Sequence, residues 1–516
     1  MAFCPLLRRC LRRCLRHGAA ALLVLSLISP WTAQAQAPAP FAALTATLDS
    51  TLDQDAFGGA HWGVAVMNVE TGTLLYQRNL DKRYVPASNV KLYTTAAALE
   101  QLGPNYRYQT PLFAHGTVAN DTLRGDLIVR GTGDPTLGGY AQRRDPTRVF
   151  RAWADSLRAA GIRHVTGSLI GDDNLFADAP FGWGWSWDDL PYSYAAPVGG
   201  LVFHQNMIDL TTTGQQVGAP ARLTWQPINT GYAQLRNETV TVAAYGKADE
   251  EYARTPGRPA LRVQSRVRQQ RTFTEELAVP DPTAFFVHVL GEVLRSEGIT
   301  VAGRAVDLDR LARAPDYAAP TMQRVATYTS PPLAEIVQPL NIESLNLYAE
   351  QILRTLGTEH PMPGSTADPG TAAMGIEAAL RTVARAGVDT SQVQLADGSG
   401  LSRHNIVTPR ATATLLRHMW AHPDTAVAQA FYASLPQGGL NGTLAYRYQD
   451  GASARGNVRA KTGTLSNMSS LSGYVRTAAG VPLAFVLMCN QYLVDGAVVR
   501  RAQDAVVNAL ARFPMR

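Results

Sequence analysis

The chain has 516 residues, of which 46% are hydrophobic and 17% are charged. This length and composition exclude a peptide, a coiled coil and a disordered tail, and they allow about three domains. Much of the formal net charge of +6 comes from arginines in the first 35 residues. The remainder is close to neutral and gives no reason to expect nucleic-acid binding.

The first 35 residues have the pattern of an export signal. Five arginines and no acidic residue precede residue 36, and an apolar run from Gly18 to Ile28 follows the arginines. Ala33-Gln34-Ala35 then matches a small-residue cleavage pattern. The apolar run is shorter than the roughly 20 residues of a membrane-spanning helix. We therefore predict a signal peptide over residues 1–35, an exported chain, and no transmembrane anchor after cleavage.

Cysteine usage predicts no disulfide in the exported part. Three of the four cysteines fall within the predicted signal, and Cys489 lies alone in an apolar stretch. A single thiol forms no intramolecular disulfide, and the apolar surroundings of Cys489 favour a buried, inert side chain.

The predicted elements begin with a helix over residues 41–55 and a hairpin over 61–79. A helix over 88–102 follows, because Pro86 marks its start and Gly103-Pro104 its end. From about residue 110 to 316 the pattern changes to short strands with two helices. The strands are expected at 121–131, 164–173, 201–210 and 260–270, and the helices at 147–160 and 282–297.

The C-terminal part returns to helical periodicity and ends in strands. Its helices are expected at 344–356, 371–386, 408–422 and 495–513, and its strands at 457–463, 469–478 and 481–490. Terminal helices packed on an antiparallel sheet predict an α+β fold. We expect one discontinuous domain over residues 36–110 and 317–516, with a strand-rich insertion over 111–316 that comprises two subdomains.

Lysine is rare in this chain, and two of its four lysines lie in short motifs. Ser88 and Lys91 lie one turn apart at the start of a predicted helix, so their side chains share a face. A neutral lysine amine can take the proton of a serine hydroxyl, which a guanidinium cannot do. Alone, the pair is better explained by an ordinary capped helix with a solvated lysine.

Two further motifs are weak signals when each is taken alone. Ser344-Leu345-Asn346 opens a predicted helix, for which Ser344 is a plausible cap. Lys461, Thr462, Gly463 and Thr464 lie on a predicted strand, where the glycine allows close approach of a ligand backbone.

Each of the three motifs occurs once in the chain. Their order along the sequence is the signature of penicillin-binding proteins and class A β-lactamases. The sequence resembles the penicillin-recognising serine enzymes. Within them it is similar to the D-alanyl-D-alanine carboxypeptidase/endopeptidase family, the low-molecular-mass class C penicillin-binding proteins of peptidase family S13. The long separation of Ser88 from Ser344, the stretch from Asp397 to Arg403 and two stretches at 131–137 and 171–189 support the narrower match.

The resemblance implies a penicillin-binding protein/β-lactamase-type transpeptidase fold, an antiparallel sheet flanked by helices, with a strand-rich insertion. It implies that Ser88 is acylated by the penultimate D-Ala carbonyl while Lys91 accepts its proton. Ser344 would relay a proton to the leaving amine, and Asn346 would hold the substrate amide. Lys461, Thr462 and Thr464 would bind the terminal carboxylate, with Gly463 between them, and the backbone N–H groups of Ser88 and Thr464 would form the oxyanion hole.

The resemblance further implies that the partners are peptidoglycan stem peptides and cross-bridges, with β-lactams as covalent inhibitors and with no cofactor. The destination is a periplasm if the envelope is Gram-negative. Two alternatives stay open: a β-lactamase-like or esterase activity on the same scaffold, and a catalytically silent peptidoglycan-binding protein. The electrostatic requirement for the base role is a neutral Lys91, which desolvation and the like charge of Lys461 would favour.

Three other features are interpreted as structural. Trp183, Trp185 and Trp187 are expected to pack within the insertion rather than to bind sugar. Ser399 lies in an Asp-Gly-Ser-Gly turn, not on a nucleophile elbow. His418 and His422 have helical i, i+4 spacing, but no third ligand is apparent in the sequence, so we predict no metal site.

Overall fold

The computed structural model describes residues 39–255, 257–312 and 314–515. The predicted signal peptide lies outside these residues. In the described part of the chain, no helix is both long enough and apolar enough to cross a membrane.

A five-stranded antiparallel sheet joins the two ends of the sequence, in the order β2-β1-β22-β21-β20. Its strands are β1 (His61–Asn68), β2 (Leu74–Arg78), β20 (Arg459–Leu465), β21 (Met468–Arg476) and β22 (Pro482–Asn490). Strand β1 pairs along its whole length with β22, so that His61 lies opposite Asn490 and Asn68 opposite Leu483. This pairing brings the N-terminal and C-terminal parts into one sheet, and β20 forms one edge of it.

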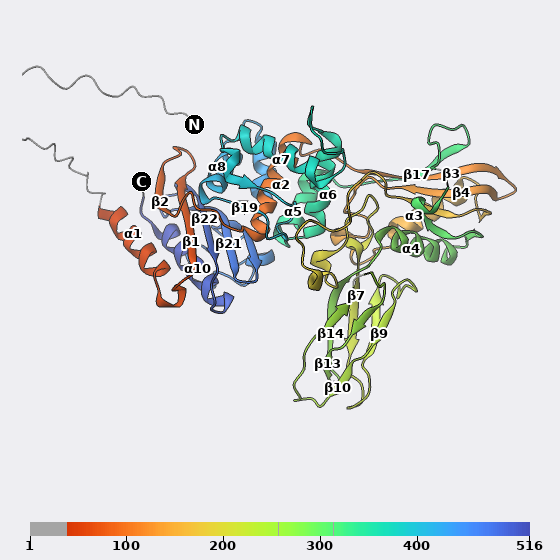
Figure 1. Cartoon of the computed structure of the whole chain (residues 1–516), viewed down its shortest axis with the longest axis horizontal. Helices are drawn as coiled ribbons and strands as arrows, with labels where there is room; N and C mark the ends of the chain where they lie inside the picture. Colours follow the sequence, from red (N-terminus) through yellow and green to blue (C-terminus); the bar gives the residue numbers. More distant parts are fainter. Residues whose placement is uncertain (1–38, 256, 313, 516) are drawn as a thin grey trace, which may run out of the picture. The chain divides into compact units, whose positions relative to one another are not determined.

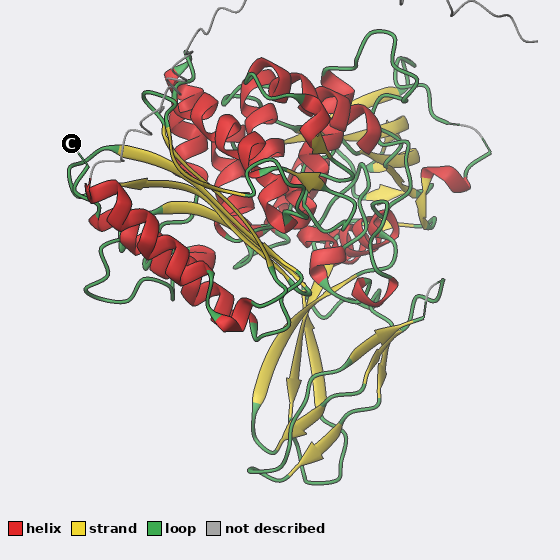
Figure 2. Cartoon of the chain, turned by 60° about the vertical axis from the view of Figure 1, so that its left-hand side comes forward, coloured by secondary structure: helices red, strands yellow, loops and turns green. Residues whose placement is uncertain are grey.

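The sheet is buried on both faces because its side chains alternate between two cores. In β22, Leu487 and Cys489 belong to a core shared with α1 (Ala39–Leu52) and α10 (Gly496–Arg512). Val486 and Met488 belong to a second core beneath a layer of helices. Figure 2 shows α10 on one side of the sheet and the cluster of helices on the other.

The helical layer supplies most of the elements around the predicted motifs. It consists of α2 (Val90–Gln101), α5 (Leu333–Ile342), α6 (Asn346–Glu359), α7 (Ala372–Arg385), α8 (Pro409–Trp420) and α9 (Thr425–Ser434). A two-stranded pair is formed by β18 (Val393–Gln394) and β19 (Ile406–Val407). The loop that connects these two strands contains residues 397–402. The expected α+β architecture, an antiparallel sheet between helical layers, is confirmed.

The inserted region contains a seven-stranded mixed sheet and a second group of strands (Figure 1). The mixed sheet comprises β3 (Gln109–Ala119), β4 (Thr122–Arg130), β5 (His164–Val165), β6 (Leu169–Asp172), β15 (Thr300–Val301), β16 (Ala305–Asp307) and β17 (Met322–Thr329). Helices α3 (Arg148–Ala159) and α4 (Pro282–Ser296) pack against it, with Phe150 and Phe286 in edge-to-face contact.

The second group of strands is formed by short segments of the middle of the chain. It comprises β7 (Met207–Thr213), β8 (Arg222–Gln226), β9 (Leu235–Asn237), β10 (Val240–Val242), β11 (Tyr252–Arg254), β12 (Leu261–Val263), β13 (Arg266–Arg268) and β14 (Thr272–Ala278). One hydrophobic core includes Leu112 of β3 and Val263 of β12. The division of the insertion into two subdomains, like the domain boundaries, stays a prediction.

Three of the predicted strands in the insertion are wrong in extent. The stretch 164–173 divides into β5 and β6. Only β7 forms within 201–210, because His204, Gln205 and Asn206 adopt left-handed backbone angles that break an extended chain. The stretch 260–270 divides into β12 and β13. The sequence pattern also missed α5, whose helix contains Pro339 and begins after Pro332.

We predict that Leu487→Ala destabilises the fold by about 2–5 kcal/mol, since the side chain has no exposed surface and lies on a central strand. Denaturant unfolding of the purified chain measures this loss. Leu493→Ala is the matched control, because Leu493 is 94% exposed and its truncation leaves no cavity. Equal effects of the two substitutions would contradict the assignment of this core.

Candidate active site

Ser88 lies at the entry to α2, in the 3-10 turn Ala87–Asn89 that leads into the helix. Ala87 has a left-handed φ of 48°, an uncommon conformation for a residue with a Cβ. Gly400 packs so closely on this turn that an added Cβ would lie 1.9 Å from the Ala87 carbonyl oxygen. The turn is therefore held by close backbone contact, and the Ser88 side chain stays half-buried.

The Lys91 amine has no exposed surface and sits among three oxygen atoms. Its Nζ lies 3.1 Å from Ser88 Oγ, 2.6 Å from Asn346 Oδ1 and 2.7 Å from the Ser399 carbonyl oxygen. These partners come from the entry of α2, the start of α6 and the 397–402 loop. Lys91 thus joins two of the predicted motifs directly.

When the Lys91 amine is neutral, the chemistry of its three partners fixes the direction of its hydrogen bond with Ser88. The Asn346 amide is oriented by its Nδ2, which donates to the Tyr194 carbonyl at 2.7 Å, so Oδ1 faces Lys91 as an acceptor. The Ser399 carbonyl is also only an acceptor. A neutral amine has two N–H donors and one lone pair. It donates to these two oxygens, and its lone pair is left for the Ser88 hydroxyl proton.

Burial lowers the pKa of Lys91 to about 7, because desolvation disfavours the ammonium form. The negative charges of Asp397 and Glu350 oppose this effect and keep the pKa from falling further. Burial and the charge of Lys91 also lower the pKa of Lys461 well below its ordinary value.

Two buried carboxylates that the sequence analysis did not single out as site residues hold the 397–402 loop against Lys91. Glu350 Oε1 accepts the backbone N–H groups of Gly398 and Ser399 at 3.0 and 2.9 Å. Asp397 accepts the N–H groups of Gly400 and Ser402 at 2.8 and 2.6 Å. The signal for Glu350 is present in the sequence as an i, i+4 pair with Arg354, although a surface pair has the same spacing.

Arg354 completes this buried network. It is 1% exposed, and its guanidinium lies 3.0 Å from Glu350 Oε2 and 2.9 Å from Asp178 Oδ1 of the insertion. Burial raises the pKa of Glu350, and Asp397 adds to the effect, while Arg354 lowers it. Removing Arg354 would leave a buried carboxylate without its cationic partner.

Strand β20 brings the third motif beside Ser88. Asn89 Nδ2 donates to the Lys461 carbonyl at 2.9 Å, and Lys461 itself has no exposed surface. A Cβ on Gly463 would lie 2.7 Å from the Pro86 carbonyl oxygen and 3.0 Å from the Ser88 nitrogen, so only glycine fits here. The Lys461 Nζ donates to the Thr462 carbonyl at 3.0 Å.

The two threonines of this motif line a small pocket of about 220 Å³ beside β20. Thr462 Oγ1 donates to Thr443 Oγ1 at 2.8 Å, and Thr464 is exposed. Arg447 and Arg500 also line the pocket, and the Arg447 guanidinium pairs with Asp504 at 2.7 Å.

Ser344 is the predicted site residue with the least direct connection to the cluster. It has a left-handed φ of 65° and lies two residues before Asn346, on the turn that leads into α6. The expected capping role is wrong, because Leu345 occupies the N-cap and no side chain caps this helix. Among the described residues, no hydrogen bond to the Ser344 side chain is found.

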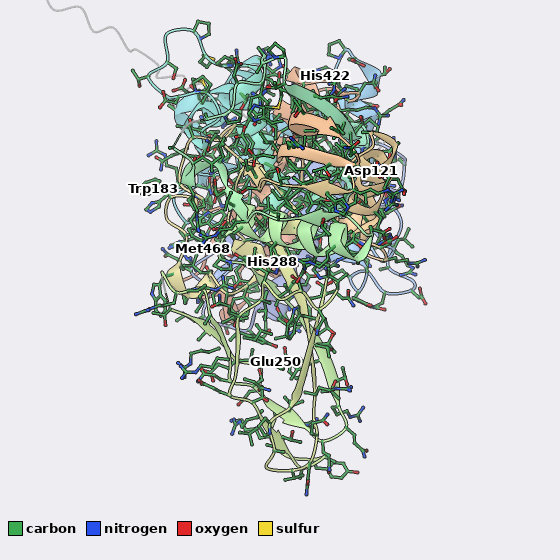
Figure 3. The ribbon with its side chains drawn as sticks, turned by 90° about the vertical axis from the view of Figure 1, so that its right-hand side faces the viewer. Asp121, Trp183, Glu250, His288, His422 and Met468 are labelled. Atoms are coloured by element: carbon green, nitrogen blue, oxygen red, sulfur yellow. The ribbon has the colours of Figure 1, made fainter. Side chains whose placement is uncertain are left out.

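The tryptophan-rich segment of the insertion reaches the same cluster. Trp185 Nε1 donates to Asp397 Oδ2 at 3.0 Å, so its packing role extends beyond the insertion. Trp183 stacks on His404 with ring centroids 3.9 Å apart, yet it remains 65% exposed and projects outward in Figure 3. Trp187 is 69% exposed, so packing within the insertion does not account for the whole group.

The fold and this serine–lysine cluster define the class of penicillin-recognising enzymes, and comparison with known proteins agrees. Penicillin-binding protein 4 from Haemophilus influenzae has the same fold, with a TM-score of 0.76 over 91% of this chain and 99% of that one at 23% identity. A D-alanyl-D-alanine carboxypeptidase from Actinomadura sp. (strain R39) is 34% identical over 505 residues, 95% of this chain and 89% of the relative.

The sequence matches the D-Ala-D-Ala carboxypeptidase 3 (S13) family over residues 44–513, and the chain belongs to that family. A carboxypeptidase named DacB from Haemophilus influenzae is 26% identical over 86% of this chain. The protein is therefore an enzyme of a serine peptidase family, and the resemblance inferred from the three motifs is confirmed.

The rarity of lysine makes the pKa of Lys91 measurable. We predict that, in protein labelled with ¹³C at lysine Cε, one of four signals titrates near pH 7 and disappears in Lys91→Met. The exposed Lys82 and Lys247 provide reference signals. A Lys91 signal that stays in its ammonium form up to pH 9 would show that burial does not control this amine.

Proposed function

We propose that the protein is a D-Ala-D-Ala carboxypeptidase and DD-endopeptidase that acts on peptidoglycan stem peptides and cross-links through an acyl-enzyme on Ser88. The observation that carries the proposal is the Ser88–Lys91 hydrogen bond, made by an amine whose other two partners are only acceptors. This arrangement gives the Ser88 proton a single acceptor.

In the proposed reaction, Ser88 Oγ attacks the carbonyl carbon of the penultimate D-Ala while its proton passes to Lys91 Nζ. The tetrahedral oxyanion is stabilised by the backbone N–H groups of Ser88 and Thr464. The C–N bond then breaks, and the departing amine receives the proton from Lys91 through Ser344. Water hydrolyses the acyl-enzyme, with Lys91 again taking a proton.

We place the substrate along β20, which is an edge strand of the five-stranded sheet. An edge strand presents backbone groups to which an extended peptide can add. Thr462 and Thr464 would bind the terminal carboxylate beside Arg447 and Arg500, which line the same pocket. A bound carboxylate would favour the ammonium form of Lys461, which would then add positive charge. Asn346 would exchange one of its present partners, Lys91 or the Tyr194 carbonyl, for the substrate amide.

The same cluster would be acylated by β-lactams, whose strained amide takes the place of the D-Ala-D-Ala bond. A structure of the Haemophilus influenzae relative is described as a complex with a β-lactam. We further propose that the chain is exported by its N-terminal signal to the compartment that holds peptidoglycan, which is the periplasm in a Gram-negative envelope.

We predict that Ser88→Ala gives no covalent adduct with a fluorescent penicillin. Lys91→Arg keeps the positive charge but provides no neutral base, so its labelling rate should fall at least about 100-fold. Gel fluorescence after timed labelling measures both. Lys82→Arg is the matched control, because Lys82 is exposed and the chemical change is the same. Near-normal labelling of Lys91→Arg would refute the base role.

Digestion of purified muropeptides tests the substrate. We predict that mass spectrometry shows loss of one alanine from pentapeptide monomers and conversion of cross-linked dimers to monomers, with neither product from Ser88→Ala. Rapid turnover of the penicillin without muropeptide cleavage would instead identify a β-lactamase-like enzyme. Absence of both an adduct and products would identify a silent binding protein.

A further inference from the structure

The far end of the catalytic helix carries a cluster of metal-ligating side chains. Glu100 lies in the last turn of α2, the helix that begins beside Ser88. His418 lies in the last turn of α8, and His422 follows that helix after its C-cap at Ala421. One ligand atom from each of these three residues lies within 4.8 Å of the other two, and no other such group occurs in the described part of the chain.

The sequence pattern alone gave two candidate metal ligands and no third. His418 and His422 have i, i+4 spacing, and their rings lie edge to face with centroids 5.5 Å apart. The fold adds Glu100 from a distant part of the chain, with its Oε2 at 3.1 Å from His418 Nε2. Ligand atoms around a tetrahedral zinc ion are about 3.4 Å apart, as bond lengths near 2.0–2.2 Å require. The carboxylate and one imidazole already have this separation.

In Glu100 and His422, one polar atom of the side chain is held by a group outside the cluster, and the other polar atom is left for a metal. Glu100 Oε1 is paired with the Arg385 guanidinium, so Oε2 faces the histidines. His422 Nδ1 lies 3.2 Å from the Asp424 carbonyl oxygen, to which an Nδ1–H donates, so the lone pair on Nε2 is the position left on that ring. Outer contacts of this kind fix the orientation of metal-ligating side chains.

The electrostatics of the cluster favour a cation. The C-terminal ends of both α2 and α8 lie here, and each carries partial negative charge on its unpaired carbonyl groups. Arg385 is the cation that opposes binding, and it contacts the outer oxygen only.

We propose that Glu100, His418 and His422 form a site for a divalent transition metal of the zinc class, which fastens the C-terminal end of the catalytic helix to α8. Two imidazole nitrogens and one carboxylate oxygen suit zinc, whereas calcium and magnesium prefer oxygen ligands alone. The side chains are half-buried, so a water molecule supplies the fourth ligand.

The consequence for the enzyme is structural. Helix α8 packs against β1 and β22 of the sheet, so a metal at this position joins α2 to the sheet through α8. A ligand that binds the folded but not the unfolded chain stabilises the fold, by an amount that grows with the logarithm of the ligand concentration relative to its Kd. The proposal is independent of the reaction at Ser88, because no residue of the metal site belongs to the catalytic cluster.

The test is zinc binding by the full chain without an affinity tag, after removal of metal by chelation. Isothermal titration should give one site in the wild type that is lost or weakened at least about 100-fold in His422→Ala and in Glu100→Gln, a larger loss than an outer contact causes. Zinc should raise the Tm of the wild type but not of His422→Ala. His422→Ala leaves the Glu100–His418 contact intact and preserves the fold.

The matched control is His288→Ala. His288 also pairs with a glutamate, Glu292 at 3.2 Å, but lies on α4 of the insertion and at a separate place in Figure 3. This variant should bind zinc and show the Tm increase like the wild type. Cys4, Cys10, Cys14 and His17 are present in every variant, so the site is measured as the difference between variants. Equal zinc affinity in the wild type and His422→Ala, or no binding in either, would overturn the proposal.

Discussion

The burial of one amine is the constraint around which this site is built. Lys91 has no exposed surface, and desolvation alone would drive its pKa far down. Glu350 and Asp397 oppose that effect without touching the amine, because both carboxylates are occupied by backbone N–H groups of the 397–402 loop. The resulting pKa near 7 suits the base role proposed for Lys91, in which the amine would take a proton and return it within one catalytic cycle.

The insertion is part of this arrangement rather than an independent attachment. Its Tyr194 carbonyl orients the Asn346 amide, its Trp185 donates to Asp397, and its Asp178 pairs with Arg354. Without these contacts, an amide, a carboxylate and a guanidinium would each lose a partner in a buried setting, which is costly for polar groups and more so for charges. The geometry around Lys91 therefore depends on residues that a catalytic domain taken alone would not contain.

The sequence was sufficient for the parts of the structure that local pattern determines. The hairpin, α2, the last three strands and α10 follow from alternation, periodicity and turn residues, and Ser88, Lys91, Asn346 and Lys461 follow from three short motifs. It was insufficient where long-range contacts decide the outcome. In the sequence, Glu350 has the spacing of a surface ion pair, and only the fold shows that it is buried. The prolines of α5 make its sequence unlike that of a helix. The left-handed turn at 204–206 follows an apolar stretch that favours a strand.

In the proposed mechanism, the two buried lysines would couple substrate binding to the base. Burial lowers the pKa of both amines, and the charge of Lys91 adds to this effect at Lys461. A substrate carboxylate beside Thr462 and Thr464 would favour an ammonium at Lys461, which would in turn disfavour one at Lys91. The amine beside Ser88 would then be a better proton acceptor when a carboxylate is bound, whereas an uncharged ester or amide would lack this effect.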